Sequence, residues 1–134
     1  MENIYIRVKG IIKKDDKYLL IKRWVDDRIP DPFVWEFVET EANYGEAPDD
    51  AVLRAIRELL SVEGKIERIV YTWSSMVGDS QCVGITYLCS IGEGDEDNFV
   101  LTEEYGEWDW VEKDKFVYYI ENRYVLNDLE RAEL

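Results

Sequence analysis

The sequence predicts an α/β fold in which a mixed β-sheet is packed between helices. Two observations carry this prediction. Strand-like and helix-like segments follow one another in the order β-β-β-α-β-β-β-α, which is typical of a sheet covered by helices. The chain has 134 residues, 46% of them hydrophobic, with 5 Trp, 9 Tyr and 4 Phe. This length leaves room for one core, so we expect a single domain over residues 1–134.

The first third of the chain is expected to form a β-hairpin followed by a loop and a third strand. Residues 4–13 carry β-branched side chains in near-alternation, and residues 17–23 form a second strand-like run after a polar turn. Residues 26–32 contain two prolines, which a central strand does not tolerate, so we expect a loop there. Residues 34–38 resume an extended pattern that places Trp35 and Phe37 in the core.

The clearest helix covers residues 48–60. Pro48 suits its first turn. At about 100° per residue, the main apolar side chains of this segment fall within one arc that faces the core. These side chains are Val52, Leu53, Ile56 and Leu60. Residues 61–64 are expected to end the helix.

The second half of the chain adds three strands and two helices. We expect strands at residues 66–74 and 81–90 around a turn at 76–79, then an acidic loop at 92–98 and a short strand at 107–111. A helix over residues 113–122 would direct Phe116, Val117 and Ile120 inward, and residues 127–134 would form a terminal helix.

The composition excludes several classes of site and partner. The chain has no histidine, which rules out Ser–His–Asp triads, Cys–His pairs and imidazole-bound zinc. Its net charge of -14 repels a nucleic-acid backbone, so we expect no nucleic-acid partner. No apolar run reaches the ~18 residues of a membrane span, and we expect no membrane partner. Cys82 and Cys89 lie seven residues apart in a strand-like run and would face opposite sides of the sheet. Reduced, buried thiols in a cytoplasmic protein are the interpretation we adopt.

The stretch Gly45-Glu46-Ala47-Pro48-Asp49-Asp50-Ala51, followed by Arg54 and Glu58, resembles the signature of the Nudix hydrolase family, G-x5-E-x7-R-E-U-x-E-E-x-G-U, where U is aliphatic. Residues 19–23 and 35–37 before it and 108–111 after it also resemble the family. The resemblance extends from about Val8 to Ile120 and implies a Nudix-type α/β/α sandwich.

The signature departs from the family pattern at four positions. Thr40 stands at its first glycine and Ser61 at its later glycine. Ala55 stands at the first helical glutamate and Leu59 at the second member of the glutamate pair. Glu46, Arg54, Ile56, Glu58 and Val62 match. Only one of the three family carboxylates on this helix is therefore present.

The resemblance also implies a chemistry and a set of site residues. Nudix enzymes hydrolyse a nucleoside diphosphate linked to another moiety, using Mg²⁺ or Mn²⁺ held by carboxylates. If the chain is active, Glu58 and Glu104 are the catalytic candidates, and Glu58, Glu103 and Glu104 are the metal-binding candidates. Glu39 or Glu41 could supply replacement oxygens. Each of these acids has surface solvation as its alternative interpretation.

Four further residues receive roles by the same resemblance. Glu46 and Arg54 are interpreted as the structural part of the signature, with Arg54 tying Glu46 and Glu58 to the junction of loop and helix. An i, i+4 ion pair on a helix surface is the alternative for Arg54 and Glu58. Trp24 and Tyr44 are the candidates for substrate binding by stacking on a base, with packing as their alternative.

Three functions remain open. The first is a Nudix-family domain with a degenerate metal site that binds a nucleoside-diphosphate-like ligand or a protein partner with weak or no hydrolysis. The second is a divergent Mg²⁺-dependent Nudix pyrophosphohydrolase, and the third is an interaction module on the inherited scaffold. A cofactor is expected only for the second, and a homodimer is compatible with all three. Two or more carboxylates near Glu58 in one cleft would favour the enzyme, whereas a cleft filled by Leu59 and aromatic side chains would favour a module.

Overall fold

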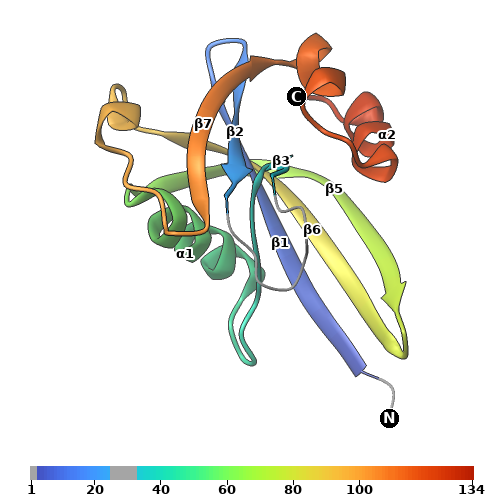
Figure 1. The fold of residues 1–134 in the computed structure, drawn as a ribbon. Helices are drawn as coiled ribbons and strands as arrows, with labels where there is room; N and C mark the ends of the chain where they lie inside the picture. Colours follow the sequence, from blue (N-terminus) through green and yellow to red (C-terminus); the bar gives the residue numbers. More distant parts are fainter. Residues whose placement is uncertain (1–2, 25–32) are drawn as a thin grey trace.

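The computed structural model describes residues 3–24 and 33–134, and the predicted loop at 26–32 lies outside them (Figure 1). The elements in chain order are β1 (Asn3–Lys14), β2 (Lys17–Arg23), β3 (Trp35–Glu36), β4 (Val38–Glu41), α1 (Pro48–Leu60), β5 (Gly64–Val77), β6 (Ser80–Ile91), the 3-10 helix η1 (Asp95–Asn98), β7 (Tyr105–Glu112), the 3-10 helix η2 (Lys113–Tyr118) and α2 (Arg123–Arg131). None of the helices in the described ranges is long and apolar enough to cross a membrane.

The long strand β1 organises the sheet. Along one edge it pairs in parallel with β6, from Asn3 opposite Ser80 to Ile12 opposite Cys89. Along the other edge it pairs antiparallel first with β4 and then, at its end, with β2. β5 pairs antiparallel with β6, and β7 with β2. The sheet is therefore mixed, as predicted.

Two strand predictions need correction. The extended run at 34–38 is not one strand, because β3 pairs with β2 while β4 pairs with β1, and Phe37 between them is buried. The hairpin of β5 and β6 is longer than predicted, since strand pairing continues to Val77 opposite Ser80 and leaves only Gly78 and Asp79 in the turn. Gly78 has a φ of 59°, a conformation that favours glycine.

The end of the chain differs most from the prediction. The expected helix at 113–122 is only the 3-10 helix η2, and Val117, expected inside, is 62% exposed. A new helix, α2, begins instead at Arg123, because the side chain of Asn122 accepts hydrogen bonds from the main-chain N–H groups of Tyr124 and Val125. The predicted terminal helix at 127–134 therefore begins and ends earlier in the chain.

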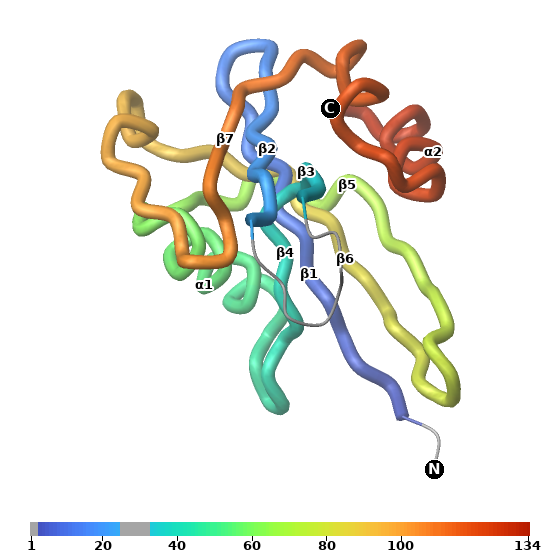
Figure 2. The backbone as a smooth tube through the Cα atoms, in the orientation of Figure 1, coloured from blue at the N-terminus to red at the C-terminus, as the bar shows by residue number. Residues whose placement is uncertain are grey.

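The alternation of side chains along the strands builds two cores. Ile12 and Leu19 point to one face, where α1 packs, and Ile11 and Leu20 point to the other face, on the side of η2 and α2. Figures 1 and 2 show α1 and α2 on opposite sides of the strands. The predicted sandwich is confirmed. Cys82 and Cys89 are free and buried, as expected.

Candidate functional site

Helix α1 has the predicted bounds and carries the signature. Val52, Ile56 and Leu60 are fully buried, whereas Leu53 is only partly buried against the same core. The helix ends where Ser61 takes a φ of 64°, the left-handed conformation that favours glycine. The Ser61 hydroxyl donates a hydrogen bond to the carbonyl of Val100 at 3.0 Å, which holds the serine in this conformation.

Arg54 joins the loop before α1 to the helix. Its Nε donates to Glu46 Oε2 at 2.9 Å, and its Nη2 donates to Glu46 Oε1 at 3.0 Å. Nη2 also donates to the carbonyl of Glu41 at 2.9 Å, and Nη1 donates to Glu58 at 3.2 Å. The guanidinium of Arg54, together with the N–H of Asn43, lowers the pKa of Glu46. Arg54 thus contacts both glutamates of the signature, in a network wider than a single helix-surface pair.

A cleft of about 360 Å³ opens beside α1, and we call it the α1 cleft. It lies between α1, the strands β1, β2 and β4, and the start of β7. Its walls are Arg7, Arg23, Glu39, Thr40, Glu41, Ala55, Glu58, Leu59, Thr102, Glu104 and Tyr105. Glu58 and Glu104 therefore share a cleft with Glu39 and Glu41, whereas Glu103 is exposed and is not part of the walls.

Three of the four glutamates in the walls of the α1 cleft contact an arginine. Arg7 contacts Glu39 at 3.3 Å, Arg23 contacts Glu104 at 3.8 Å, and Arg54 contacts Glu58 at 3.2 Å. Within residues 3–24 and 33–134, no group of three or more Asp, Glu, Cys or His side chains is arranged to hold a metal ion.

The helical positions of the missing carboxylates do not fit a divalent cation. Ala55 is 1% exposed and belongs to the core, and Leu59 packs on the same core while it lines the cleft. Methyl and isobutyl groups offer no oxygen, and Mg²⁺ in proteins is held through carboxylates, water and phosphate. Ala55 and Leu59 therefore supply no ligand at the two helical positions where the family signature has carboxylates.

The segment around Thr40 is a regular strand. Residues Val38–Glu41 pair antiparallel with β1, and Thr40 lies opposite Val8. Among the described non-glycine residues only Asp15 and Ser61 have positive φ. The resemblance implies a flexible glycine loop at this point, and the structure has strand β4 instead.

The two aromatic candidates for substrate binding lie outside the α1 cleft. Trp24 is half-exposed and packs edge-on against Phe33, with its ring over Gly106. Tyr44 is fully exposed and lies in the turn between β4 and α1. Figure 2 shows this connection projecting from the domain. Neither lines the α1 cleft or the larger hollow on the other face.

This larger hollow, of about 890 Å³, lies between the sheet and α2, and we call it the α2 groove. Its walls include Tyr5, Arg7 and Lys9 from β1, Trp73 from β5, and Glu36, Glu39, Asn122 and Asp128. Arg7 and Glu39 line both hollows, so the two share part of their walls. Sequence reasoning missed the groove, although charged Arg7 and Lys9 at alternate positions of a predicted strand are a signal of a polar face.

A hydrogen-bonded cluster joins Arg23 and Tyr105 of the α1 cleft to Glu36 of the α2 groove. Arg23 Nη2 donates to Glu36 Oε1 at 2.6 Å and to the hydroxyl of Tyr105 at 2.7 Å. The Tyr105 hydroxyl in turn donates to Glu36 Oε1 at 2.5 Å. Burial and the neighbouring carboxylate raise the pKa of Tyr105, so this hydroxyl remains a donor.

Comparisons with known proteins support the fold and the family resemblance. A family model described as NUDIX domain matches residues 5–129. A MutT protein from Methanosarcina mazei Go1 superposes with a TM-score of 0.80 at 18% identity, over 97% of this chain and 93% of that one. The ORF135 protein of E. coli gives 0.77 at 20% identity, over 96% and 88%. An Ap4A hydrolase of C. elegans gives 0.75 at 17% identity, over 94% and 93%. A search of curated protein sequences found no match.

Proposed function

The chain belongs to the Nudix family, as the resemblance of its signature indicates, and from this premise we propose that it is a binding domain for a diphosphate-containing, nucleotide-like ligand, with weak or no hydrolysis. The observation that carries the proposal is the pairing in the α1 cleft, where Glu39, Glu104 and Glu58 of the walls contact Arg7, Arg23 and Arg54 respectively. To converge on a metal ion, each of these carboxylates would have to leave its arginine.

Arginine side chains give the α1 cleft its own means of holding phosphate. A guanidinium forms the same two-pronged hydrogen bonds with a phosphate as with a carboxylate. The Arg7–Glu39 and Arg23–Glu104 contacts, at 3.3 and 3.8 Å, are long for charge-assisted hydrogen bonds. A diphosphate would therefore exchange with Glu39 and Glu104 at Arg7 and Arg23. The hydroxyl of Thr40 in the same walls is a further donor.

A divergent Mg²⁺-dependent pyrophosphohydrolase is the second candidate. Its support is that Glu39, Glu41, Glu58 and Glu104 line one cleft, which leaves four acidic and two basic side chains in its walls. A divalent cation would offset that excess of negative charge when phosphate enters. For this function, however, Glu58 would have to leave Arg54 and Glu104 would have to leave Arg23.

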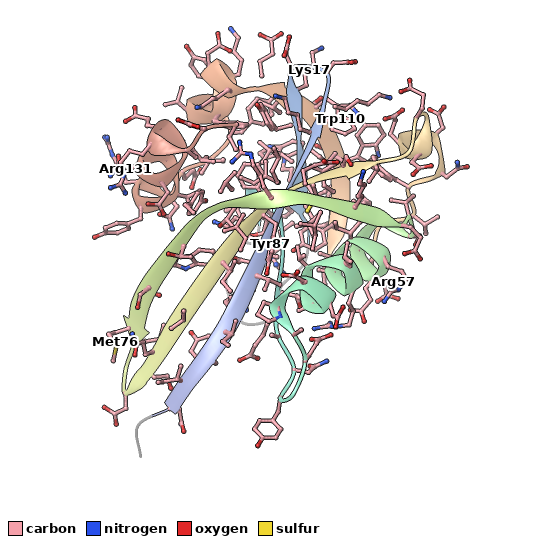
Figure 3. All side chains as sticks on the ribbon, turned by 180° about the vertical axis from the view of Figure 1, so that it is seen from behind. Lys17, Arg57, Met76, Tyr87, Trp110 and Arg131 are labelled. Carbon is pink, nitrogen blue, oxygen red and sulfur yellow. The ribbon has the colours of Figure 1, made fainter. Side chains whose placement is uncertain are left out.

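The two functions are separated by measuring binding and turnover on the same samples. We would titrate the protein with ADP and UDP by calorimetry, once with EDTA and once with Mg²⁺, and screen a library of nucleoside diphosphate derivatives for hydrolysis. We expect binding in EDTA that is lost in Arg7→Ala, together with little or no turnover. Binding and rapid turnover that both require Mg²⁺ would overturn the proposal in favour of the hydrolase. Arg57→Ala is the matched control, because Arg57 lies on the exposed side of α1 and contacts only Glu63 among the described residues (Figure 3).

A further inference from the structure

Strand β5 forms one edge of the sheet, and its two halves differ in how this edge is protected. Within the part of the chain that the structure describes, β5 pairs with β6 on one side and with no strand on the other. Its free side therefore presents main-chain N–H and C=O groups to which another strand can add. Natural edge strands usually prevent such addition by charged side chains, by β-bulges or by a covering segment.

The first half of β5, residues 64–70, has all three kinds of protection. Lys65, Glu67 and Arg68 place charges on it. Its register with β6 shifts twice before the second half begins, so this half is bulged. The guanidinium of Arg68 donates a hydrogen bond to the carbonyl of Glu133, which brings the residues after α2 against this part of the strand.

The second half, residues 71–77, has none of these protections, and we call it the open edge. It pairs with β6 without any further shift of register, and it contains no charged residue, proline or glycine. Met76 and Val77 are 65% and 63% exposed. Figure 1 shows the tip of the β5–β6 hairpin projecting beyond the helices, and Figure 3 shows Met76 near that tip.

The open edge lies in the least charged part of the sequence. Asp79 is the one charged residue between Ile69 and Gly92, although 34% of the whole chain is charged. Two copies of a chain with a net charge of -14 repel each other where their acidic surfaces meet. A surface without charge is where two copies approach at the lowest electrostatic cost. A cationic partner, in contrast, would gain nothing at this edge.

The open edge is also complementary to itself. Two copies that add edge to edge in an antiparallel pair are related by a two-fold axis, with the same segment on both sides. Side chains directly opposite each other point to the same face of the sheet, so the axis passes through one residue. The centre of residues 71–77 is Ser74. With the axis at Ser74, no pair joins two charges, and the opposed residues of the two copies are Ser74 with Ser74, Trp73 with Ser75, Thr72 with Met76, and Tyr71 with Val77.

We propose that the open edge is a self-association surface, at which two copies of this chain form a dimer whose sheets continue into each other across a two-fold axis at Ser74. Aromatic and β-branched side chains at Tyr71, Thr72, Trp73 and Val77 suit such strand pairing. No residue of β5 is among the walls of the α1 cleft, so the dimer does not depend on the proposed function.

Two substitutions at the axis test the dimer by sedimentation velocity of the full chain over a series of concentrations. Ser74 is exposed, so Ser74→Glu and Ser74→Lys should both fold, as circular dichroism would check. Each places two like charges opposite each other, and each should raise the dissociation constant of the dimer at least about tenfold. Ser74→Lys also reduces the net negative charge, so general repulsion between copies would predict stronger association for this variant.

Asn98→Glu is the matched control. Asn98 is exposed in η1, far from the open edge in Figure 1, and its replacement adds the same charge as Ser74→Glu. This variant should associate like the unmodified protein.

Hydrogen exchange provides a second measurement that needs no variant. We would compare the main-chain amides of the unmodified protein at low and high concentration. Exchange should slow at high concentration in residues 71–77, because amides that pair with a second copy are protected. It should not change in residues 64–70.

The outcomes either support or overturn the dimer at this edge. Concentration-dependent association that both Ser74 variants weaken and Asn98→Glu retains would support it. A monomer at every concentration would overturn it. A dimer that persists in both Ser74 variants would place the interface elsewhere and overturn it. Association that is lost in Ser74→Glu but strengthened in Ser74→Lys would also overturn it, because net charge would then govern the association.

Discussion

The α1 cleft and the α2 groove share Arg7 and Glu39 but differ in how their charges are arranged. In the α1 cleft three glutamates each contact an arginine, and the helical positions of two family carboxylates are apolar. In the α2 groove the nearby carboxylates are also hydrogen-bonded to arginines, whereas the buried Lys9 lies over the rings of Trp73 and Tyr71 and has no hydrogen bond or ion pair within the described residues. The comparison teaches that in both regions carboxylates near the hollow are paired with arginines, whereas the α1 cleft has apolar side chains at two positions where the family signature has carboxylates.

The largest expected effect comes from restoring a family carboxylate at Ala55. This residue is 1% exposed, so Ala55→Glu buries a charge in the core and should reduce the free energy of unfolding by about 3 kcal/mol or more. Leu59→Glu, at a partly buried position that lines the cleft, should cost only about 1 kcal/mol. Denaturant unfolding of both variants checks the contrast, and equal losses would show that the two positions share one environment.

The melting temperature of Leu59→Glu with and without Mg²⁺ provides a second test of the same face of α1. Leu59→Glu would place a second carboxylate beside Glu58. Mg²⁺ should then raise the melting temperature of this variant, since an ion that is bound only by the folded state stabilises the folded state. The unmodified protein should show no such rise. A variant that folds normally without any metal-dependent shift would indicate that this face of α1 is not a latent metal site.

The next effect concerns the floor of the α2 groove. Gly84→Ala places a methyl group where the ring of Trp73 now lies, so we expect a loss of about 1–3 kcal/mol and a changed tryptophan fluorescence. In a Trp73→Ala background the same change should be almost neutral, because the clash is gone. A penalty that persists in that background would place its origin in the β6 main chain and not in the ring.

A smaller effect is expected from the arginine that organises the α1 side. Arg54→Ala removes four hydrogen bonds, including both to Glu46, and should lower the melting temperature by about 5 °C. Arg57→Ala on the same helix breaks one exposed contact with Glu63 and should change it little. Similar melting temperatures for the two variants would contradict the role of Arg54 as the link between loop and helix.

The regions also differ in how far the sequence predicted them. Helix α1 was predicted with its observed bounds, because Pro48 marks its start and the spacing of Val52, Ile56 and Leu60 marks its buried face. Helix α2 was predicted too late in the chain, at residues 127–134. Its start depends on the hydrogen bonds that the side chain of Asn122 accepts, and these compete with the apolar pattern of residues 113–122. The break at Phe37 was missed for a related reason, since it depends on the change of strand partner.

The site residues were also predicted to different extents, depending on whether they lie close together in the sequence. The resemblance located Glu46, Arg54 and Glu58, because these residues are close in the chain at a characteristic spacing. The α2 groove brings Lys9 of β1 together with Trp73 of β5, and this contact depends on the register of β1, β6 and β5, which no local pattern encodes. The ion pairs of Arg7 and Arg23 likewise join separate strands and loops. Trp24 and Tyr44 remain predictions for substrate binding, from positions outside both hollows.

The smallest expected effect is the pH dependence of Lys9. Burial lowers the pKa of Lys9 below its ordinary value of 10.5, so the unfolded chain binds this proton more tightly than the folded one. The folded state is therefore penalised at neutral pH, and the penalty fades as pH rises through the lowered pKa towards 10.5. Lys9→Met should be more stable than the unmodified protein at pH 7, with a difference that narrows at alkaline pH. Urea denaturation across this range checks the sign, and a widening difference would contradict it.

The central claim is that arginine-bound carboxylates have replaced a metal site in the α1 cleft, and calorimetric titration of the unmodified protein with Mg²⁺ and Mn²⁺ tests it most directly. Because Glu58 contacts Arg54 and lacks acidic neighbours at positions 55 and 59, the account predicts weak binding without a defined stoichiometry. A tight site for one ion that disappears in Glu58→Gln would contradict the account and restore a metal-dependent hydrolase.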